Sequence, residues 1–289
     1  MKTGKTLTRA ALKSLPLPPV VDGDKETKGR ILVVAGSREV AGAALLTATA
    51  AMRAGAGKLR MVSIEGVEVQ TALAMPEAMV LGLQEAHDGG FTRSAVRKIR
   101  EQANQADVVV AGPGMAQAKT CADLAETLLE SSASIVLDAA LLRSLRPLGA
   151  GARGSRQPPI LLPHSGELSS LLDCDEDEID SDPIGCGHRA AEKYGAHVLV
   201  KGVTSHVVTA DGSAWTYSGG APGLGVSGSG DTLAGIVGGL LARGADSLTA
   251  LLWAVLLHGE AGEALSRKIG PIGFLARQIP DEIPALLAR

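Results

Sequence analysis

The sequence is poor in aromatic residues, because phenylalanine, tryptophan and tyrosine together make up only 2% of its 289 residues. Proteins that bind single-stranded nucleic acid without sequence preference stack the bases on exposed aromatic rings. Positive charge is not concentrated either: the formal net charge is −3, and no basic stripe or long block of one sign occurs. The sequence therefore gives no support to a function in nucleic-acid binding.

Cysteine is also scarce, and its three positions, Cys121, Cys174 and Cys186, show no metal-ligand spacing. An odd number of scattered thiols favours a reducing compartment. The first thirty residues alternate polar, basic and proline-rich segments, unlike a signal peptide. No apolar run approaches the ~20 residues needed to cross a bilayer, and the longest candidate, residues 248–257, is expected to be a core helix. We therefore expect a cytoplasmic protein that does not contact a membrane.

Glycine, by contrast, is abundant, with 36 residues, and it often follows an apolar segment directly. Residues 31–35 form a continuous apolar run typical of a buried parallel strand, and Gly36-Ser37 then lead to an Ala-rich helix at about 42–54. The same rhythm predicts further strands at 59–63, 107–111, 135–138, 160–162 and 198–201, a hairpin of 205–209 with 214–217, and helices at 117–131, 231–243 and 247–268.

This alternation predicts an α/β fold of three layers, with helices on both faces of a mostly parallel central sheet. Ligands of such sheets bind beyond the carboxyl ends of the strands, so the glycine-rich segments there should share one face. The proline-rich residues 1–29 are expected to be an irregular lead-in, and residues 149–159 a loop. Without an internal repeat or a clear linker, residues 1–289 are expected to form a single domain.

The most informative segment is Gly228-Ser229-Gly230-Asp231, which precedes an apolar helix with one predicted buried face. A glycine-rich loop that enters a helix presents unpaired amides and the positive end of the helix dipole, which together bind phosphate. Asp231 would repel a phosphate if it only capped the helix. It fits the site if it is a general base that accepts the proton of an attacking hydroxyl.

A simpler interpretation of the same spacing is that Asp231 is the N-cap of the helix, behind a glycine turn. The spacing alone does not decide between a base and a cap. No Walker A pattern occurs in the sequence, which argues against nucleotide binding by a P-loop.

Eight short segments of the sequence match segments of one known family and occur in the same order. They are Val-Ala-Gly-Ser at 34–37 with Ala-Gly-Ala-Ala-Leu-Leu at 41–46, Arg-Ala-Gly-Ala-Gly at 53–57, Gly-Pro-Gly-Met at 112–115, Leu-Leu-Pro-His-Ser-Gly-Glu at 161–167, Val-Lys-Gly at 200–202, Gly-Ser-Gly-Asp-Thr-Leu-Ala-Gly at 228–235, His-Gly-Glu-Ala-Gly-Glu at 258–263 and Gly-Phe-Leu-Ala at 273–276. Over about residues 29–287, the chain resembles the ADP/ATP-dependent (S)-NAD(P)H-hydrate dehydratases, a branch of the ribokinase-like superfamily.

The resemblance implies a lyase that uses ADP or ATP with Mg²⁺ to dehydrate the S epimer of hydrated NADH or NADPH. By analogy with kinases of this fold, the nucleotide would phosphorylate the 6-hydroxyl, and phosphate would then leave with help from the ring nitrogen. Phosphate and water oxygens would hold most of the Mg²⁺ coordination, so no metal-ligating side chain is assigned. A homo-oligomer is also implied. A separate epimerase is expected as a partner in the pathway, because only about 29 residues precede the first strand.

Carried over by position, the implied site has three parts. The catalytic part comprises Asp231, as base and contact to the hydrated nicotinamide, with Gly228, Ser229 and Gly230. The nucleotide-binding part comprises Lys201, Gly202, Val203, Thr204, Ser205 and Gly230. The dinucleotide-substrate part comprises Ala43, Gly114, His164 and Asp231.

Most of these residues also have an ordinary structural explanation. Lys201 could be a solvated lysine at a strand end, His164 a loop histidine, Ala43 helix packing and Glu167 only a helix cap near Gly166. His258, in an apolar helix, is expected to be buried and hydrogen-bonded rather than a ligand. The acidic run 173–182 is expected to be a solvated face and loop.

Several polar residues of the family pattern are replaced in this chain. The replacements are Asp138-Ala139-Ala140 for Asp-Ala-Asp, Gly219-Gly220 for Gly-Asn, Val226 for threonine, Ser165 for proline and Arg277-Gln278 for Ser-Asp. Most of them should lie near the phosphate side of the site. Two other functions therefore stay open: a small-molecule kinase of the thiazole or hydroxymethylpyrimidine type, and a catalytically weakened nucleotide-binding homologue.

Overall fold

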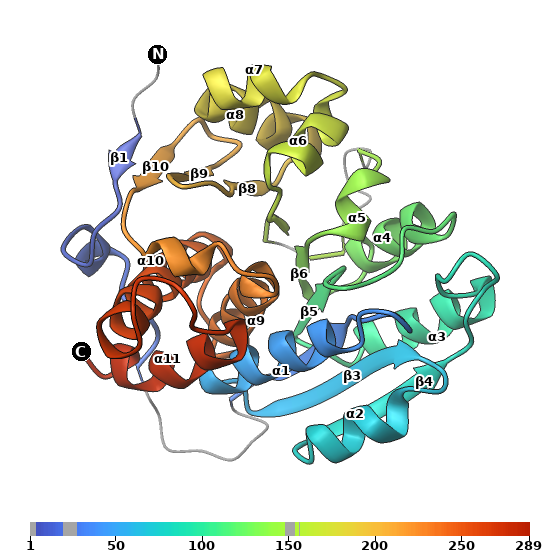
Figure 1. The fold of residues 1–289 in the computed structure, drawn as a ribbon. Helices are drawn as coiled ribbons and strands as arrows, with labels where there is room; N and C mark the ends of the chain where they lie inside the picture. Colours follow the sequence, from blue (N-terminus) through green and yellow to red (C-terminus); the bar gives the residue numbers. More distant parts are fainter. Residues whose placement is uncertain (1–3, 20–27, 148–153, 156) are drawn as a thin grey trace.

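The computed structural model describes residues 4–19, 28–147, 154–155 and 157–289. Within these residues, ten strands form one sheet in the order β1-β10-β9-β8-β7-β6-β5-β2-β3-β4 (Figure 1). Neighbouring strands are parallel except at β8/β9 and β9/β10, which are antiparallel. The predicted mostly parallel sheet, with an antiparallel hairpin near one edge, is therefore confirmed.

The strands are β1 (Lys5–Thr6), β2 (Arg30–Val34), β3 (Lys58–Ile64), β4 (Ala78–Leu83), β5 (Val108–Ala111), β6 (Ser134–Leu137), β7 (Ile160–Leu161), β8 (His197–Val200), β9 (Ser205–Val208) and β10 (Ala214–Tyr217). The α-helices are α1 (Gly42–Arg53), α2 (Glu68–Ala74), α3 (Arg93–Ala103), α4 (Cys121–Leu129), α5 (Ala140–Arg143), α6 (Ser165–Leu172), α7 (Glu176–Ser181), α8 (Pro183–Tyr194), α9 (Ser229–Ala242), α10 (Ser247–Lys268) and α11 (Ile279–Leu287). Three short 3₁₀ helices are η1 (Ala11–Ser14), η2 (Pro222–Leu224) and η3 (Ala276–Gln278).

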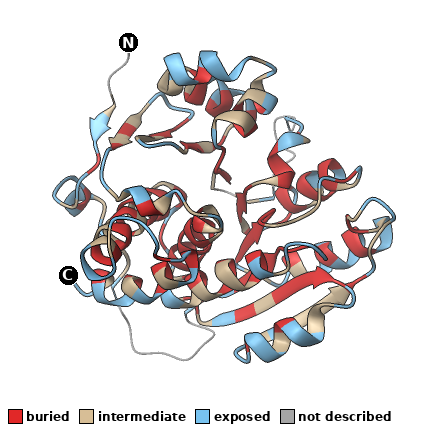
Figure 2. Cartoon of the chain, viewed as in Figure 1, coloured by how far each residue is buried: buried red, intermediate tan, exposed pale blue. Residues whose placement is uncertain are grey.

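Two hydrophobic cores lie on the two faces of this sheet, because successive strand residues point to opposite sides. Val33 and Val110 belong to the core that α1, α9, α10 and α11 cover, whereas Val34 and Val109 belong to the core covered by α3, α4, α6 and α8. Buried residues accordingly fill the central strands and the inner helix surfaces (Figure 2). The three-layer α/β/α architecture expected from the sequence is thereby confirmed.

Helix α9 departs from the predicted pattern of one buried face, because 12 of its 14 residues are buried. Glycines let it approach its neighbours on two sides. A Cβ atom added at Gly235 would lie 2.2 Å from the Thr47 carbonyl oxygen of α1, and one at Gly238 would lie 2.4 Å from Val110 Cγ2 of β5. The helix is therefore enclosed between the sheet and α1, and its amino end is fixed by core packing.

Residues before β2 are more ordered than the predicted irregular lead-in. Strand β1 pairs in parallel with β10, and Leu12 of η1 is 1% exposed. Arg9 forms an ion pair of 2.5 Å with Glu260 of α10, and Trp253 Nε1 donates to the Leu15 carbonyl at 2.7 Å. This segment therefore adds the edge strand next to β10 and ties that side of the sheet to α10.

Several elements were not predicted at all. The structure adds α2, β4 and α3 between β3 and β5, and the acidic run expected to be a solvated face and loop contains the helix α7. The helix predicted at 117–131 is shorter, because α4 begins only at Cys121. The loop predicted at 149–159 lies largely outside the described residues.

Helix α10 is longer than the apolar run seen in the sequence. Its 22 residues make it the one helix of the described chain that is long and apolar enough to span a bilayer. However, 72% of its most apolar stretch is buried inside the fold. The expectation that no apolar segment approaches membrane-spanning length was wrong, but the assignment of this segment to the core agrees with its burial.

Candidate active site

The segments that follow five parallel strands meet on the side of the sheet formed by the carboxyl ends of the strands, as predicted. We call this side the carboxyl edge. They begin at Gly36 after β2, Gly112 after β5, Asp138 after β6, His164 after β7 and Lys201 after β8. Hydrogen bonds join neighbouring segments: the Gly36 amide donates to the Pro113 carbonyl at 2.8 Å, and the Lys201 amide donates to the Pro163 carbonyl at 2.9 Å. The edge is therefore a connected surface.

The amino end of α9 faces this edge and forms a cradle of backbone amides. Gly228 is the N-cap, with a φ of +88° that favours glycine. The first intrahelical hydrogen bond runs from the Thr232 amide to the Gly228 carbonyl at 3.1 Å. The amides of Gly230 and Asp231 precede that bond, so the helix itself supplies no acceptor for them. We refer to Gly228, Gly230 and Asp231 as the amide cradle, a site suited to an anion.

Asp231 is the third residue of α9 and is not its N-cap, so the capping interpretation of this residue is wrong. Burial, assisted by the negative charge of Asp138, raises the pKa of Asp231 to about 6, and Lys201 opposes this rise. The side chain is only partly buried. A carboxylate with a pKa near 6 is ionised at neutral pH and is a better proton acceptor than an ordinary aspartate.

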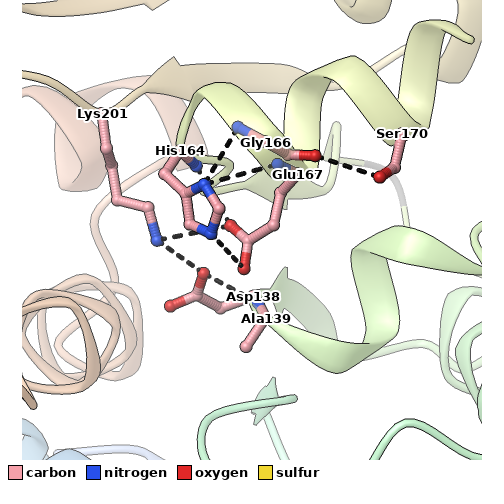
Figure 3. Close-up of polar contacts among 7 residues, drawn as sticks. All are labelled: Asp138, Ala139, His164, Gly166, Glu167, Ser170 and Lys201. Carbon is pink, nitrogen blue, oxygen red and sulfur yellow. Dashed lines mark hydrogen bonds and ion pairs between the residues drawn. The ribbon is translucent and has the colours of Figure 1, made fainter. Parts of the chain in front are cut away.

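The Lys201 ammonium group is directed toward Asp138 and Glu167 rather than into solvent (Figure 3). Its Nζ lies 2.7 Å from Asp138 Oδ1 and 3.9 Å from Glu167 Oε2. Only 20% of the lysine side chain is exposed. A Cβ at Gly230 would lie 3.6 Å from the same nitrogen, so the ammonium group lies beside the amide cradle. The interpretation of Lys201 as a solvated strand-end lysine is therefore wrong.

Glu167 and His164 form a reciprocal cap at the start of α6. The His164 amide donates to Glu167 Oε2 at 3.0 Å, and the Gly166 amide donates to His164 Nδ1 at 3.1 Å (Figure 3). Glu167 does cap this helix, as its ordinary explanation held, and it also lies within 3.9 Å of Lys201. His164 keeps 51% of its side chain exposed at the rim of the site.

Two predicted substrate residues pack against each other on the opposite side of the cradle. A Cβ at Gly114, whose φ is +62°, would lie 2.4 Å from Ala43 Cβ. Helix α1, which carries Ala43, also reaches the cradle, because a Cβ at Gly228 would lie 2.5 Å from Leu46 Cδ1. Ala43 is 2% exposed, so its side chain serves the packing of this wall.

The rest of the predicted nucleotide segment joins β8 to β9 at the surface. Gly202 and Val203 are exposed, whereas Thr204 and Ser205 are half-buried. The chain therefore turns outward immediately after Lys201. This places an open polypeptide segment next to the lysine.

Ser229 points away from the cradle toward α10. Its hydroxyl lies 3.0 Å from His258 Nε2, and Ser229 is 6% exposed. Burial lowers the pKa of His258 to about 4, so this imidazole is neutral at physiological pH. His258 is hydrogen-bonded within the protein, as expected.

Some of the replaced family positions do flank the cradle. The Val226 carbonyl accepts from the Ser229 amide at 3.1 Å, and Ala140 directly follows Asp138 and Ala139. Gln278 Oε1 accepts from the Leu275 amide at 2.8 Å, in the turn whose Ala276 Cβ would lie 3.2 Å from a Cβ at Gly228. Gly220 lies farther along the preceding loop, where its amide donates to Glu263 Oε1 at 3.2 Å.

The partners of Lys201 are the functional neighbours that the sequence did not identify. Asp138 is 63 residues away in the chain, and Glu167 was assigned only a capping role. The available signal was their position, since both stand just after strands whose carboxyl ends share the edge.

The fold, with an amino end of α9 suited to an anion, defines the class of protein, a ribokinase-like α/β enzyme. The model of the family described as NAD(P)H-hydrate dehydratase matches residues 31–285, and this chain belongs to that family. It is 45% identical over 288 residues to the ADP-dependent (S)-NAD(P)H-hydrate dehydratase of Xanthomonas campestris, covering 99% of this chain and 96% of the relative.

Other relatives include longer proteins and a solved structure. The bifunctional NAD(P)H-hydrate repair enzyme of Moorella thermoacetica is 32% identical, and the match covers 98% of this chain but 54% of that protein. The Bacillus subtilis ADP/ATP-dependent NAD(P)H-hydrate dehydratase, co-crystallised with ATP and Mg²⁺, superposes with a TM-score of 0.86 at 25% identity, covering 100% of this chain and 99% of that one. The family resemblance and the ribokinase-like fold predicted from the sequence are confirmed.

Proposed function

We propose that this chain uses ADP or ATP to dehydrate the S epimer of hydrated NADH or NADPH, restoring NADH or NADPH. The observation that carries this proposal is Asp231, a carboxylate with a pKa raised to about 6 that stands in the amide cradle of a chain belonging to this family. A base and an anion site in contact are what phosphoryl transfer to an alcohol requires.

Within this proposal, Asp231 accepts the proton of the 6-hydroxyl and also contacts the hydrated nicotinamide. The amides of Gly230 and Asp231 and the ammonium group of Lys201 stabilise negative charge on the terminal phosphate. The nucleotide supplies the phosphoryl group that turns the hydroxyl into a leaving group, and Mg²⁺ neutralises its phosphates. The residues present fit such a ligand, since the cradle provides amides without helical acceptors and Lys201 lies beside it.

The two walls of the site suggest where each ligand lies. We assign the nucleotide to the side of Lys201, with the outward segment 202–205 along its adenosine. The dinucleotide substrate is assigned to the opposite side, against Ala43 and Gly114, with His164 at the rim. Gly228 and Ser229 shape the cradle, because Gly228 leaves room for Leu46 and Ser229 is held by His258.

The decisive assay follows absorbance at the reduced-nicotinamide band, with hydrated NADH, Mg²⁺ and either ADP or ATP. We expect absorbance to appear only with nucleotide present. Asp231→Asn should lower kcat by about 10²- to 10⁴-fold, the usual contribution of a general base, while ADP affinity is retained. A stable phosphorylated alcohol without NADH would indicate a kinase instead. Equal dehydration rates for the parent protein and Asp231→Asn would contradict the role of Asp231 as the base.

Four further features belong to the same proposal. We infer a single domain, a homo-oligomer, a cytoplasmic location and a separate epimerase that supplies the S epimer. The bifunctional names of relatives about twice this length motivate the epimerase. Light scattering tests the oligomer, and a substrate enriched in the R epimer should react slowly until an epimerase is added.

A further inference from the structure

Ala139 holds an unusual backbone conformation next to the site. Its φ is +50° and its ψ is −121°, a combination that favours glycine, as in the first central position of a type II′ turn. Among the described residues, Asp173 is the other non-glycine residue with positive φ, but it ends α6 in the ordinary left-handed cap conformation. Strain of this kind persists only where the surroundings enforce it.

The contacts that enforce this turn are made by the backbone of the preceding residue, Asp138. The Asp138 amide donates to the Ala111 carbonyl at 3.0 Å. A Cβ at Gly112 would lie 1.8 Å from the Asp138 carbonyl oxygen, so the two backbones pack closely. The Ala139 amide then donates to Asp138 Oδ1 at 2.9 Å. The strained turn therefore fixes the direction of the Asp138 carboxylate.

That carboxylate is directed at Lys201 (Figure 3). Its side chain is 3% exposed, and its Oδ1 receives both the Ala139 amide and the Lys201 ammonium group at 2.7 Å. Lys201 thus has three carboxylates near it: Asp138 in direct contact, Glu167 at 3.9 Å, and Asp231, which interacts through charge. Whichever carboxylate binds the lysine decides how free Asp231 is to act.

We propose that Ala139 and Asp138 form a positioning device for Lys201, in which the strained turn aims Asp138 so that it holds the ammonium group beside Gly230 and competes with Asp231 for it. This inference rests on the proposed role of Asp231 as the base. It makes Asp138 and Ala139 positioning residues, since they act through Lys201 and do not themselves touch the reacting atoms.

The charged and titratable groups around Asp231 come from four elements. They are Asp138 after β6, Lys201 after β8, Glu167 and His164 at the start of α6, and His258 of α10. Asp138 raises the pKa of Asp231 and Lys201 lowers it. Removing the charge of Asp138 should therefore lower the pKa of Asp231 in two ways. It removes the repulsion between the two carboxylates, and it releases Lys201 to interact with Asp231.

The test is a titration of the Asp231 carboxyl by NMR with ¹³C-labelled aspartate, assigned by its loss in Asp231→Asn. In Asp138→Asn, the pKa of Asp231 should fall by about one unit or more, the usual effect of a newly available cation. The acidic limb of kcat should move to lower pH by the same amount. Asp107→Asn is the matched control, because it removes a carboxylate at the other end of the neighbouring strand. An unchanged Asp231 titration in Asp138→Asn would overturn the proposal.

Two substitutions at Ala139 test the turn separately. Glycine accepts positive φ, so Ala139→Gly should keep the titration and a kcat within about twofold of the parent. A β-branched residue rejects that conformation, so Ala139→Val should reproduce the shift of Asp138→Asn. A Val variant that folds without a shift would contradict the role of the turn, as would a shift in the Gly variant. If Ala139→Val does not fold, Asp138→Asn and Ala139→Gly still decide the matter.

The titration needs no turnover, so it separates two kinds of failure. A shifted titration in a protein that does not dehydrate hydrated NADH would overturn the proposed function and leave the positioning of Lys201 standing. A protein that dehydrates hydrated NADH normally, but whose Asp231 pKa is unchanged in Asp138→Asn, would overturn the positioning of Lys201 and leave the proposed function standing.

Discussion

At the scale of single residues, the position of Asp231 lowers the stability of the folded protein when its carboxylate is ionised. Its pKa in the folded protein is raised to about 6 from an ordinary value of 3.8. A raised pKa contributes stability that is complete below about pH 4 and is lost as pH rises through about 6. The protein therefore folds with this carboxylate ionised at neutral pH against an unfavourable free energy.

This cost predicts opposite effects of Asp231→Asn on activity and stability. At pH 8 the free energy of unfolding should rise by about 2 to 3 kcal/mol, because two pKa units correspond to about that energy. At pH 3 the variant and the parent should be equally stable, since the carboxyl is then protonated in both folded and unfolded chains. Urea unfolding at the two pH values measures the difference. A gain that is the same at both would rule out ionisation as its cause.

The same scale shows what the sequence could predict of the site. Gly228 and Asp231 could be predicted as candidates because a glycine-rich helix start suited to an anion is a local pattern. The interactions of Lys201 could not, because no spacing within the chain relates it to Asp138, 63 residues away. The strained conformation of Ala139 also leaves no trace in its residue type. Only the shared edge of the sheet brings these residues together.

At the scale of elements, the contact between α1 and α9 depends on the absence of side chains. Gly235→Ala would place a Cβ atom only 2.2 Å from the Thr47 carbonyl oxygen, which is too close for two non-bonded atoms. Overpacking of this kind typically costs about 1 to 3 kcal/mol. We expect that loss in urea unfolding, and a lower kcat because the cradle moves with α9. Gly42→Ala is the control, since a Cβ there meets nothing within 4 Å. It should be neutral or gain at most about 1 kcal/mol.

Elements with clear ends were predicted best. The predicted helix 247–268 matches α10, which has Asp246 as N-cap and Arg267 and Lys268 in its last turn. Strand β4 was missed because it lies at the sheet edge, where most of its residues are half-buried or exposed and no alternation marks it. The one-sided pattern predicted for α9 failed because its glycines are also buried contacts, which a count of apolar residues overlooks.

At the scale of the whole molecule, the N-terminal residues hold the β10 side of the sheet and α10 together. Leu12→Ala should lower the free energy of unfolding by about 2 to 5 kcal/mol, as for other fully buried leucines. Lys13→Ala, at an exposed neighbouring position, should change it by less than about 0.5 kcal/mol. Chemical denaturation of both variants measures the contrast. Similar values for the two would show that this segment adds little to the fold.

The enclosure of α9 has a consequence for how such a protein could diversify. The amide cradle is the first turn of a helix whose remaining surface is committed to α1, the sheet and α10. Mutation can hardly reshape that turn without harming the interior, so the shape of the cradle is inherited together with the architecture. New ligand preferences would arise more easily at peripheral positions, such as the exposed Gly202 and Val203 and the rim around His164.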